Sequence, residues 1–212
     1  MRLFLIRHGQ TKWNVELRAQ GHTDIPLDET GCQQAEQLAS SLTKSYIRHI
    51  WTSDMQRALG TAQPIASITG APLRKMTVLR ERKLGVLEGK PFYELGATIT
   101  NYSRQHGVPY YKVPIEGGES IEDVWNRLDE VIAELDDVVD NCAIVSHGGT
   151  TSLLLAKLVK GNIETARSFR LGNASVTVLE RYEDRWLVHR VNDTSHLSKQ
   201  TNLAGSVDGA TR

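Results

Sequence analysis

The fold is decided by residues 3–11, LFLIRHGQT, in which an apolar run stops at a histidine and a glycine. Residues 143–150, AIVSHGGT, repeat this pattern in the second half of the chain. An apolar run of this length that ends near glycine is typical of a strand buried on both faces. Ligands of open α/β sheets bind beyond the carboxyl ends of the strands, so we expect His8 and His147 to meet at one site.

The composition is that of a globular protein without an overall charge. Of the 212 residues 40% are hydrophobic, and 25 Lys and Arg balance 25 Asp and Glu. This length is enough for one large domain or two small ones. A balanced charge gives no global basic field of the kind that nucleic-acid-binding proteins use, so we predict no nucleic-acid partner.

The sequence also predicts a protein that is neither secreted nor inserted in a membrane. The first apolar run has four residues, whereas a signal peptide needs about 7–15. No later run approaches the roughly 20 apolar residues that span a bilayer. Cys32 and Cys142 are isolated and too few for a disulfide scaffold, so we expect a cytoplasmic location.

Predicted strands alternate with predicted helices along the chain. Helical spacing of apolar residues predicts helices at 35–42, 54–66, 121–135 and 153–156. Further strands are predicted at 47–51, 72–79, 175–180 and 186–191. There is no fixed-period repeat and no interdomain linker. We therefore expect residues 1–212 to form one α/β domain, a three-layer α/β/α sandwich with a largely parallel sheet and a loose tail from about Ser195.

Two capping-box patterns mark helix starts. The Ser-x-x-Gln pattern at Ser53 predicts a helix from about Asp54, although Pro64 should kink or strain its middle. Ser120 and Asp123 form the second pattern, at the start of the clearest amphipathic stripe in the chain.

Residues 91–118 differ in composition and are predicted to form an inserted lid or subdomain over the active site. The segment holds four of the six tyrosines among Gly and Pro, namely Tyr93, Tyr102, Tyr110 and Tyr111. Two interpretations stay open, because these tyrosines either pack the insert or contact a substrate with some apolar surface.

Arginines accompany the predicted site. Arg7 directly precedes His8, and Arg57 falls in the first turn of the helix predicted after residue 53. Helix N-termini present unpaired N–H groups and a positive dipole end, and an arginine beside them adds bidentate hydrogen bonds that match phosphate. The sequence therefore predicts a phosphate ligand.

Five motifs, in this order, resemble those of the histidine phosphatase, or phosphoglycerate-mutase-like, superfamily. They are Leu-Ile-Arg7-His8-Gly9-Gln10-Thr11 with Asn14, Ser53-x-x-x-Arg57-Ala58, Thr61-Ala62, Glu81, and Ser146-His147-Gly148. The resemblance spans roughly residues 1–180. It implies a phosphomonoester hydrolase of the histidine acid phosphatase type, which needs neither a metal ion nor a cofactor.

By this resemblance His8 is the nucleophile, and it forms a phosphohistidine intermediate that water then hydrolyses. Arg7, Arg57 and His147 would hold the phosphoryl oxygens with fixed donors. Because an imidazole must carry a free lone pair to attack, the two arginines also help by disfavouring a positive charge on His8.

Glu81 is the predicted proton donor to the leaving group and the later base toward water. A bound phosphate dianion should favour the protonated form of a neighbouring carboxyl group. The alternative is that Glu81 only pairs with Arg80 or Arg82.

The resemblance implies further residues around the substrate. Asn14 and the backbone N–H of Gly148 look like additional donors, and Gln20 and Gly21 lie in a segment that borders the substrate in this family. His22 and Thr23 of the same segment are weaker candidates, because polar loop residues are commonly turn-forming. The other histidines have no motif around them and are expected to be surface or structural residues: His49, His106, His189 and His196.

Three other functions are alternatives to a histidine phosphatase. A cofactor-dependent phosphoglycerate mutase would use the same histidine chemistry, but the insert, with Arg104, His106 and Lys112, lacks a paired-arginine clamp. A metallohydrolase would need further ligands close to His8 or His147 in sequence, which are absent. A non-catalytic phosphate-binding module would not need all the motif residues. The sequence does not decide which phosphomonoester is the substrate or whether the protein forms a homodimer.

Overall fold

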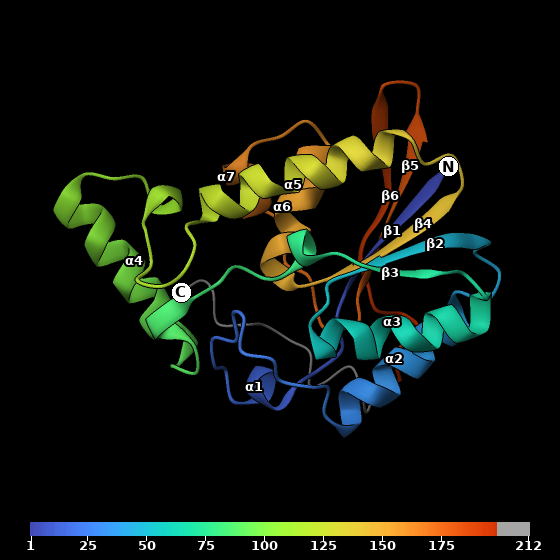
Figure 1. The fold of residues 1–212 in the computed structure, drawn as a ribbon, viewed down its shortest axis with the longest axis horizontal. Helices are drawn as coiled ribbons and strands as arrows, with labels where there is room; N and C mark the ends of the chain where they lie inside the picture. Colours follow the sequence, from blue (N-terminus) through green and yellow to red (C-terminus); the bar gives the residue numbers. More distant parts are fainter. Residues whose placement is uncertain (199–212) are drawn as a thin grey trace.

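A six-stranded sheet forms the centre of the computed structural model, which describes residues 1–198 (Figure 1). The strands are β1 (Arg2–Arg7), β2 (Ile47–Thr52), β3 (Leu73–Lys75), β4 (Asn141–Ser146), β5 (Val176–Tyr182) and β6 (Arg185–Asp193), in the order β3-β2-β4-β1-β5-β6. The first four strands are mutually parallel, and β5 and β6 join antiparallel. The sheet is therefore largely parallel, as predicted.

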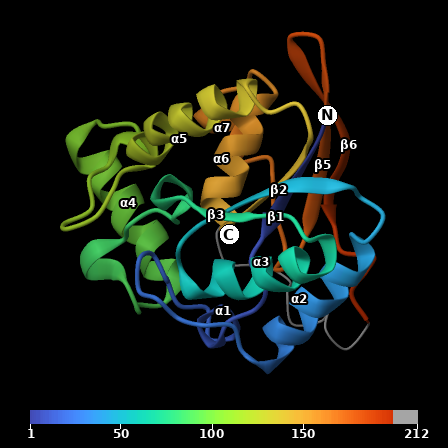
Figure 2. The same cartoon turned by 45° about the vertical axis from the view of Figure 1, so that its right-hand side comes forward.

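Helices cover both faces of this sheet (Figures 1 and 2). They are α1 (Lys12–Val15), α2 (Glu29–Ser41), α3 (Gln56–Thr69), α4 (Phe92–His106), α5 (Ile121–Asp136), α6 (Gly148–Leu158) and α7 (Ile163–Ala166), with 3-10 turns η1 (Thr77–Leu79), η2 (Gly85–Leu87) and η3 (Tyr110–Lys112). α2 and α3 pack on one face, and α5, α6 and α7 on the other. This is the predicted three-layer sandwich.

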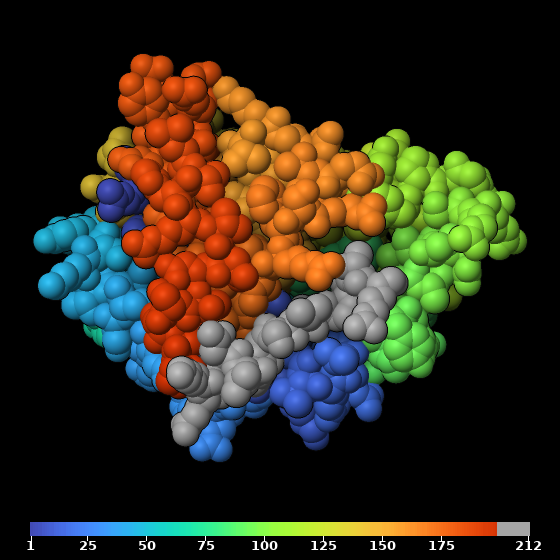
Figure 3. All heavy atoms as spheres, turned by 180° about the vertical axis from the view of Figure 1, so that it is seen from behind, coloured from blue at the N-terminus to red at the C-terminus, as the bar shows by residue number. Residues whose placement is uncertain are grey.

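β1 shows why its apolar run is unbroken. Leu3 and Leu5 pack into the core beneath α5 and α6, whereas Phe4 and Ile6 pack into the core beneath α2 and α3. Side chains alternate across a strand, so a strand between two helical layers needs apolar residues at every position. β6, the edge strand, is exposed along most of its length and lies on the face seen in Figure 3.

Two sequence-based predictions of local structure were wrong. The helix predicted from Asp54 begins at Gln56 as α3, and Met55 is its N-cap without a side-chain hydrogen bond. The hydroxyl of Ser53 does not cap the first turn, because it lies against His147 instead. The strand predicted at 72–79 is confined to β3, since the chain turns into η1 and carries Val78 and Leu79 into the core.

Other local predictions were confirmed. Ser120 and Asp123 form a reciprocal capping box at the start of α5. α3 continues through Pro64, and the kink or strain expected there stays a prediction. The predicted tail from Ser195 falls mostly outside the described residues.

Residues 91–118 contain α4 and η3 and lie at one end of the molecule (Figure 1). They share a small apolar cluster with the segment before them, which includes Leu84, Leu87, Leu95 and Ile99. Two of the four tyrosines, Tyr102 and Tyr110, pack against this cluster, whereas Tyr93 is exposed.

The N-terminal turn of α2 packs directly on the loop after β1. A Cβ atom on Gly31 would lie 2.0 Å from the carbonyl oxygen of Gln10, and both positions are main chain. We expect Gly31→Ala to lower the free energy of unfolding by about 1–3 kcal/mol, because neither backbone can yield without shifting the loop. Gly96→Ala in α4, where a Cβ would meet nothing within 4 Å, is the matched control and should be neutral or stabilising. Urea unfolding of both variants measures this, and equal midpoints would contradict it.

Candidate active site

Three parallel strands deliver the predicted site residues to one edge of the sheet. Arg7 at the end of β1 pairs in register with Ser146 at the end of β4, and Thr52 of β2 pairs with Val145. The residue after each strand therefore enters the same crevice. The His8 and His147 rings meet there edge to face, with their centroids 5.2 Å apart.

His8 is buried and held in one tautomer. Its Nδ1 lies 2.7 Å from the carbonyl oxygen of Gly9. A carbonyl can only accept, so Nδ1 carries the proton and Nε2 has the free lone pair. Burial lowers the pKa of His8 well below its ordinary value, and the positive charges of Arg57 and Arg7 lower it further. The imidazole is therefore neutral, as a nucleophile must be.

Arg57 is fully buried and connects the loop of Gly21 and Thr23 to His147. Its Nη2 donates to the carbonyl of Gly21 at 2.8 Å, its Nη1 donates to the carbonyl of Thr23 at 3.0 Å, and its Nε donates to Nδ1 of His147 at 3.1 Å. Burial lowers the pKa of Arg57 to about 10, against the opposing effect of Glu81 and other nearby carboxylates. The guanidinium thus stays charged at neutral pH.

His147 has a protein partner on each ring nitrogen. Because Arg57 donates to Nδ1, the proton of the neutral ring lies on Nε2, which is 2.9 Å from the Ser53 hydroxyl. Burial lowers the pKa of His147 well below its ordinary value, and Arg57 lowers it further. The capping-box pattern at Ser53 concealed its contact with His147. The position of Ser53 immediately after the end of β2 was the sequence feature that could have indicated this contact.

Arg7 lies against the first turn of α6. Its Nη1 donates to the carbonyl of Leu171 at 2.6 Å. A Cβ atom on Gly148 would lie 3.4 Å from Arg7 Nε, so a glycine lets the start of α6 approach the guanidinium closely.

Glu81 sits at the N-terminus of α6. Its Oε2 accepts from the backbone N–H of Gly149 at 2.9 Å, and its Oε1 accepts from the backbone N–H and the hydroxyl of Thr150 at 3.2 and 3.1 Å. Arg80 instead forms a two-pronged ion pair with Asp54. The Arg80 side chain therefore does not pair with Glu81, whereas the backbone N–H of Arg82 donates to Glu81 Oε1 at 2.9 Å. The Glu81 carboxylate faces the helix start where the sequence predicted an anion.

The Asn14 side chain belongs to a network that fixes the loop after β1. Its Oδ1 accepts from the backbone N–H and the hydroxyl of Thr11 and from the amide of Asn173. The same Asn173 amide donates to the carbonyls of His8 and Gly9. The sequence analysis missed Asn173, which carries no motif and lies beside the His8 loop only in space.

Residues 20–23 form the wall beside Arg57. Gln20 is buried, and its Oε1 has no hydrogen-bond partner among residues 1–198. The Glu88 carboxylate accepts from the backbone N–H of His22 at 2.9 Å and from the Thr23 hydroxyl at 2.6 Å. Glu88, which the sequence analysis missed, therefore holds the loop whose carbonyls bind Arg57.

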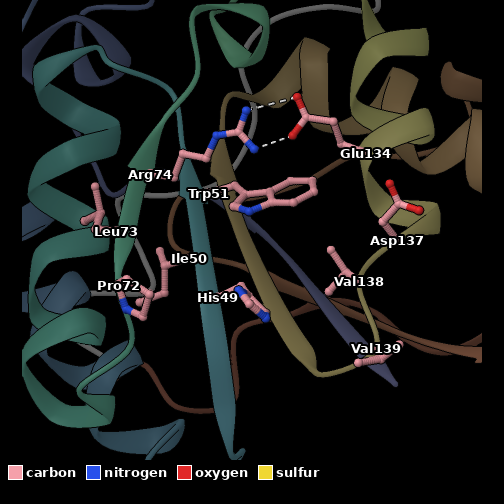
Figure 4. Close-up of a pocket in the computed structure, with 10 residues that line it drawn as sticks. All are labelled: His49, Ile50, Trp51, Pro72, Leu73, Arg74, Glu134, Asp137, Val138 and Val139. Carbon is pink, nitrogen blue, oxygen red and sulfur yellow. Dashed lines mark hydrogen bonds and ion pairs between the residues drawn. The ribbon is translucent and has the colours of Figure 1, made fainter.

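The remaining histidines lie outside this cluster. His106 stacks on Tyr102, His189 pairs with Glu180, and His196 bonds the carbonyl of Ala174. His49 lines a separate surface cavity of about 470 Å³ between β2, β3 and the end of α5, where Arg74 pairs with Glu134 (Figure 4).

Within residues 1–198, no three His, Cys, Asp or Glu side chains are grouped so that they could hold a metal ion. The helices described in the structure are too short or too polar to cross a membrane.

The two buried histidines predict a pH dependence of stability. Below an unfolded-state pKa of about 6.5 the unfolded chain binds protons that folded His8 and His147 do not. Their stabilising effect is thus complete above this pH and is lost as the pH falls below it, by up to about 1.4 kcal/mol per pH unit for each histidine. Urea unfolding at pH values between about 7.5 and 5.5 measures how steeply the free energy of unfolding depends on pH. Burial also lowers the pKa of His196, which adds to the slope. His147→Gln should make the slope smaller, and an unchanged slope in that variant would contradict the assignment.

Comparisons with known proteins identify the family. The histidine phosphatase superfamily (branch 1) model matches residues 3–194. The chain is 33% identical to the probable phosphoglycerate mutase GpmB of Shigella boydii over 93% of this chain and 95% of that protein.

Two solved structures are also similar. The mycobacterial glucosyl-3-phosphoglycerate phosphatase is 34% identical, with a TM-score of 0.80 over 91% of this chain and 99% of that one. The alpha-ribazole phosphatase from Shigella flexneri is 28% identical, with a TM-score of 0.81 over 91% and 96%. The family match over nearly the whole chain, together with the fold, shows that this chain belongs to the histidine phosphatase superfamily.

Proposed function

We propose that the protein hydrolyses small organic phosphomonoesters through a phosphohistidine intermediate on His8. The observation that carries this proposal is the placement of His8, which is buried with its Nδ1 2.7 Å from the carbonyl oxygen of Gly9 and whose pKa is lowered by burial and by the charges of Arg57 and Arg7. Such a ring presents a nucleophilic Nε2 in a pocket that attracts a phosphate dianion.

The residues around His8 divide the reaction into two steps. First, the Nε2 lone pair forms a bond to phosphorus, the ester P–O bond breaks, and the leaving oxygen takes a proton from Glu81. Second, Glu81 takes a proton from water, whose oxygen bonds to phosphorus as the N–P bond breaks and inorganic phosphate leaves. Arg7 and Arg57 balance the charge that develops on the phosphoryl oxygens. This scheme needs neither a metal ion nor a cofactor.

His147 contributes its Nε2–H to the same phosphoryl group in this proposal. In the described structure this N–H faces the Ser53 hydroxyl, so the phosphoryl oxygen takes the place of that partner. Asn14, Gln20, Gly21 and the backbone N–H of Gly148 complete the border of the pocket. The unpartnered Oε1 of buried Gln20 supports a contact with a hydroxyl group of the substrate.

We also propose that residues 91–118 form a wall or lid of the substrate site within a single domain. The support is a backbone pairing between the two segments that flank the pocket. Ala19 donates to the carbonyl of Lys90 at 2.9 Å, and Gly89 donates to the carbonyl of Ala19 at 2.8 Å. The entry to the insert is thus fixed beside Gln20 and Gly21.

The relatives define the substrates to test. One similar structure is that of a glucosyl-3-phosphoglycerate phosphatase, another is that of an alpha-ribazole phosphatase, and a curated relative is named a probable phosphoglycerate mutase. Screening glucosyl-3-phosphoglycerate, alpha-ribazole phosphate, 3-phosphoglycerate, phosphoserine and sugar phosphates by kcat/KM ranks them, and we expect the best substrate to have a leaving group with some apolar surface.

Product analysis with 3-phosphoglycerate and p-nitrophenyl phosphate tests the reaction class. We expect inorganic phosphate from at least one of these esters or from a member of the substrate panel. Isomerised 3-phosphoglycerate without release of phosphate would establish the mutase instead. If none of the esters is hydrolysed at mildly acidic or neutral pH, the result would favour the non-catalytic phosphate-binding module.

A further inference from the structure

The segment that carries Glu81 has no regular secondary structure to hold it. Residues 80–84 belong to no helix or strand. Their carbonyl groups must therefore find donors elsewhere, since buried or half-buried backbone acceptors are costly to leave unpaired. Thr150 donates its hydroxyl to the carbonyl of Arg80 at 2.8 Å, and His22 Nε2 lies 2.9 Å from the carbonyl of Glu81.

Another side chain binds three main-chain carbonyls of residues 78–81, whereas the side chains of Thr150 and His22 bind one each. Arg127 of α5 donates through Nη1 to the carbonyl of Val78, and through Nη2 to the carbonyls of Arg80 at 2.7 Å and Glu81 at 3.2 Å. The planar guanidinium can satisfy several acceptors in fixed directions, which an ammonium group cannot do.

Glu119 extends the same contact to the other side of Glu81. Its Oε1 accepts from Arg127 Nε at 3.1 Å, and its Oε2 accepts from the backbone N–H of Lys83 at 2.8 Å. The Arg127–Glu119 pair therefore binds the main chain at Glu81, which we assign as the acid, and on both sides of it.

The helix that carries Arg127 is packed into the core. Arg127 lies on α5 between Val124 and Leu128, which are both fully buried in the core. α5 begins directly after the insert at a complete capping box. Arg127 thus connects the main chain around Glu81 to the core.

We propose that Arg127 is a positioning residue that holds Glu81 in the geometry needed for proton transfer to the leaving group. This inference rests on the proposed role of Glu81 as the acid. It predicts that loss of Arg127 acts on the protonation of the leaving group and leaves nucleophilic attack by His8 largely intact.

The test compares two leaving groups. p-Nitrophenolate leaves readily without a proton, whereas the alkoxide of glycerol 3-phosphate needs one. We expect Arg127→Gln to lower kcat/KM for glycerol 3-phosphate by about 100-fold but that for p-nitrophenyl phosphate by less than about tenfold. Arg127→Lys, which keeps the charge but not the fork, should give an intermediate ratio between the two substrates.

Arg181→Gln is the matched control. Arg181 also donates to three main-chain carbonyls, those of Leu135, Asp136 and Val138, but at the other end of α5. We expect this variant to lose stability, as judged by Tm, without changing the ratio of the two kcat/KM values. A purely structural role of Arg127 would give the same unchanged ratio and would overturn the inference.

Glu81→Gln in the same assays separates this inference from the proposed function. If Glu81→Gln changes the ratio and both Arg127 variants leave it unchanged, the positioning role is overturned and the role of Glu81 stands. If Glu81→Gln itself leaves the ratio unchanged, Glu81 is not the acid and the inference falls with it. Should Arg127→Gln fail to fold, Arg127→Lys alone decides, because a retained wild-type ratio then contradicts the need for the fork.

Discussion

His8→Ala is expected to lower kcat/KM by at least about 10⁴-fold for every phosphomonoester that the wild-type protein hydrolyses. No neighbouring group can replace the lost nucleophile, because His147 is held by Arg57 on one nitrogen and by Ser53 on the other. The pocket without His8 still binds phosphate through its arginines. The loss should therefore appear in kcat, with a much smaller effect on the inhibition constant of inorganic phosphate.

The control for this prediction is His49→Ala. His49 lines the surface cavity between β2, β3 and the end of α5, whose lining includes no residue of the His8 site, so its variant should keep wild-type kcat/KM (Figure 4). Circular dichroism would verify that His8→Ala is folded. Turnover within tenfold of wild type in a folded His8→Ala protein would contradict the nucleophile assignment.

Arg57→Met is expected to be the next most damaging change, with a loss of about 10³-fold in kcat/KM. Methionine fills much of the buried space but removes the donors to Gly21, Thr23 and His147. The phosphoryl group would lose a positively charged partner, and the loop of residues 20–23 would lose one of its anchors. Two carbonyls left without donors should also lower the free energy of unfolding by about 2–4 kcal/mol.

Steady-state kinetics and urea unfolding check both effects of Arg57→Met. Arg57→Lys should recover little, because a point charge cannot reproduce three directed hydrogen bonds. Arg48→Met on the exposed side of β2 is the control and should change neither quantity. A variant at Arg57 that retains more than a tenth of wild-type kcat/KM would show that this arginine has no essential part in the reaction.

The central part of the fold could be predicted because its signals are local. The unbroken apolar runs of β1 and β4 require burial on both faces, and a terminal glycine marks where each ends. Parallel strands bring the residues after their carboxyl ends to one edge of the sheet, so the meeting of His8 and His147 could be predicted from the sequence. The stripe and capping box of α5 are local in the same way.

The supporting residues could not be predicted because their partners are distant in sequence. Ser53 matches a helix cap within four residues, yet its hydroxyl bonds a histidine 94 positions away. Asn173 and Arg127 reach the loops of His8 and Glu81 across 165 and 46 to 49 positions. Short-range patterns identify the reacting groups, whereas the residues that orient them become visible only in three dimensions.

The antiparallel end of the sheet was hidden for a related reason. β5 and β6 have the same short apolar pattern as a parallel strand, and only the tight connection between them, from Tyr182 to Arg185, indicates a hairpin. β3 was overestimated because Val78 and Leu79 are equally apolar in a buried 3-10 turn and in a strand.

The most direct test of the account is to trap the covalent intermediate. The wild-type protein is mixed with the best substrate of the panel, carrying a labelled phosphoryl group, and quenched within milliseconds under alkaline conditions that preserve phosphohistidine. Peptide mapping then locates the label. The account predicts an acid-labile phosphoryl group on Nε2 of His8 that is absent from His8→Ala, whereas a label on another residue, or the same label in His8→Ala, would contradict it.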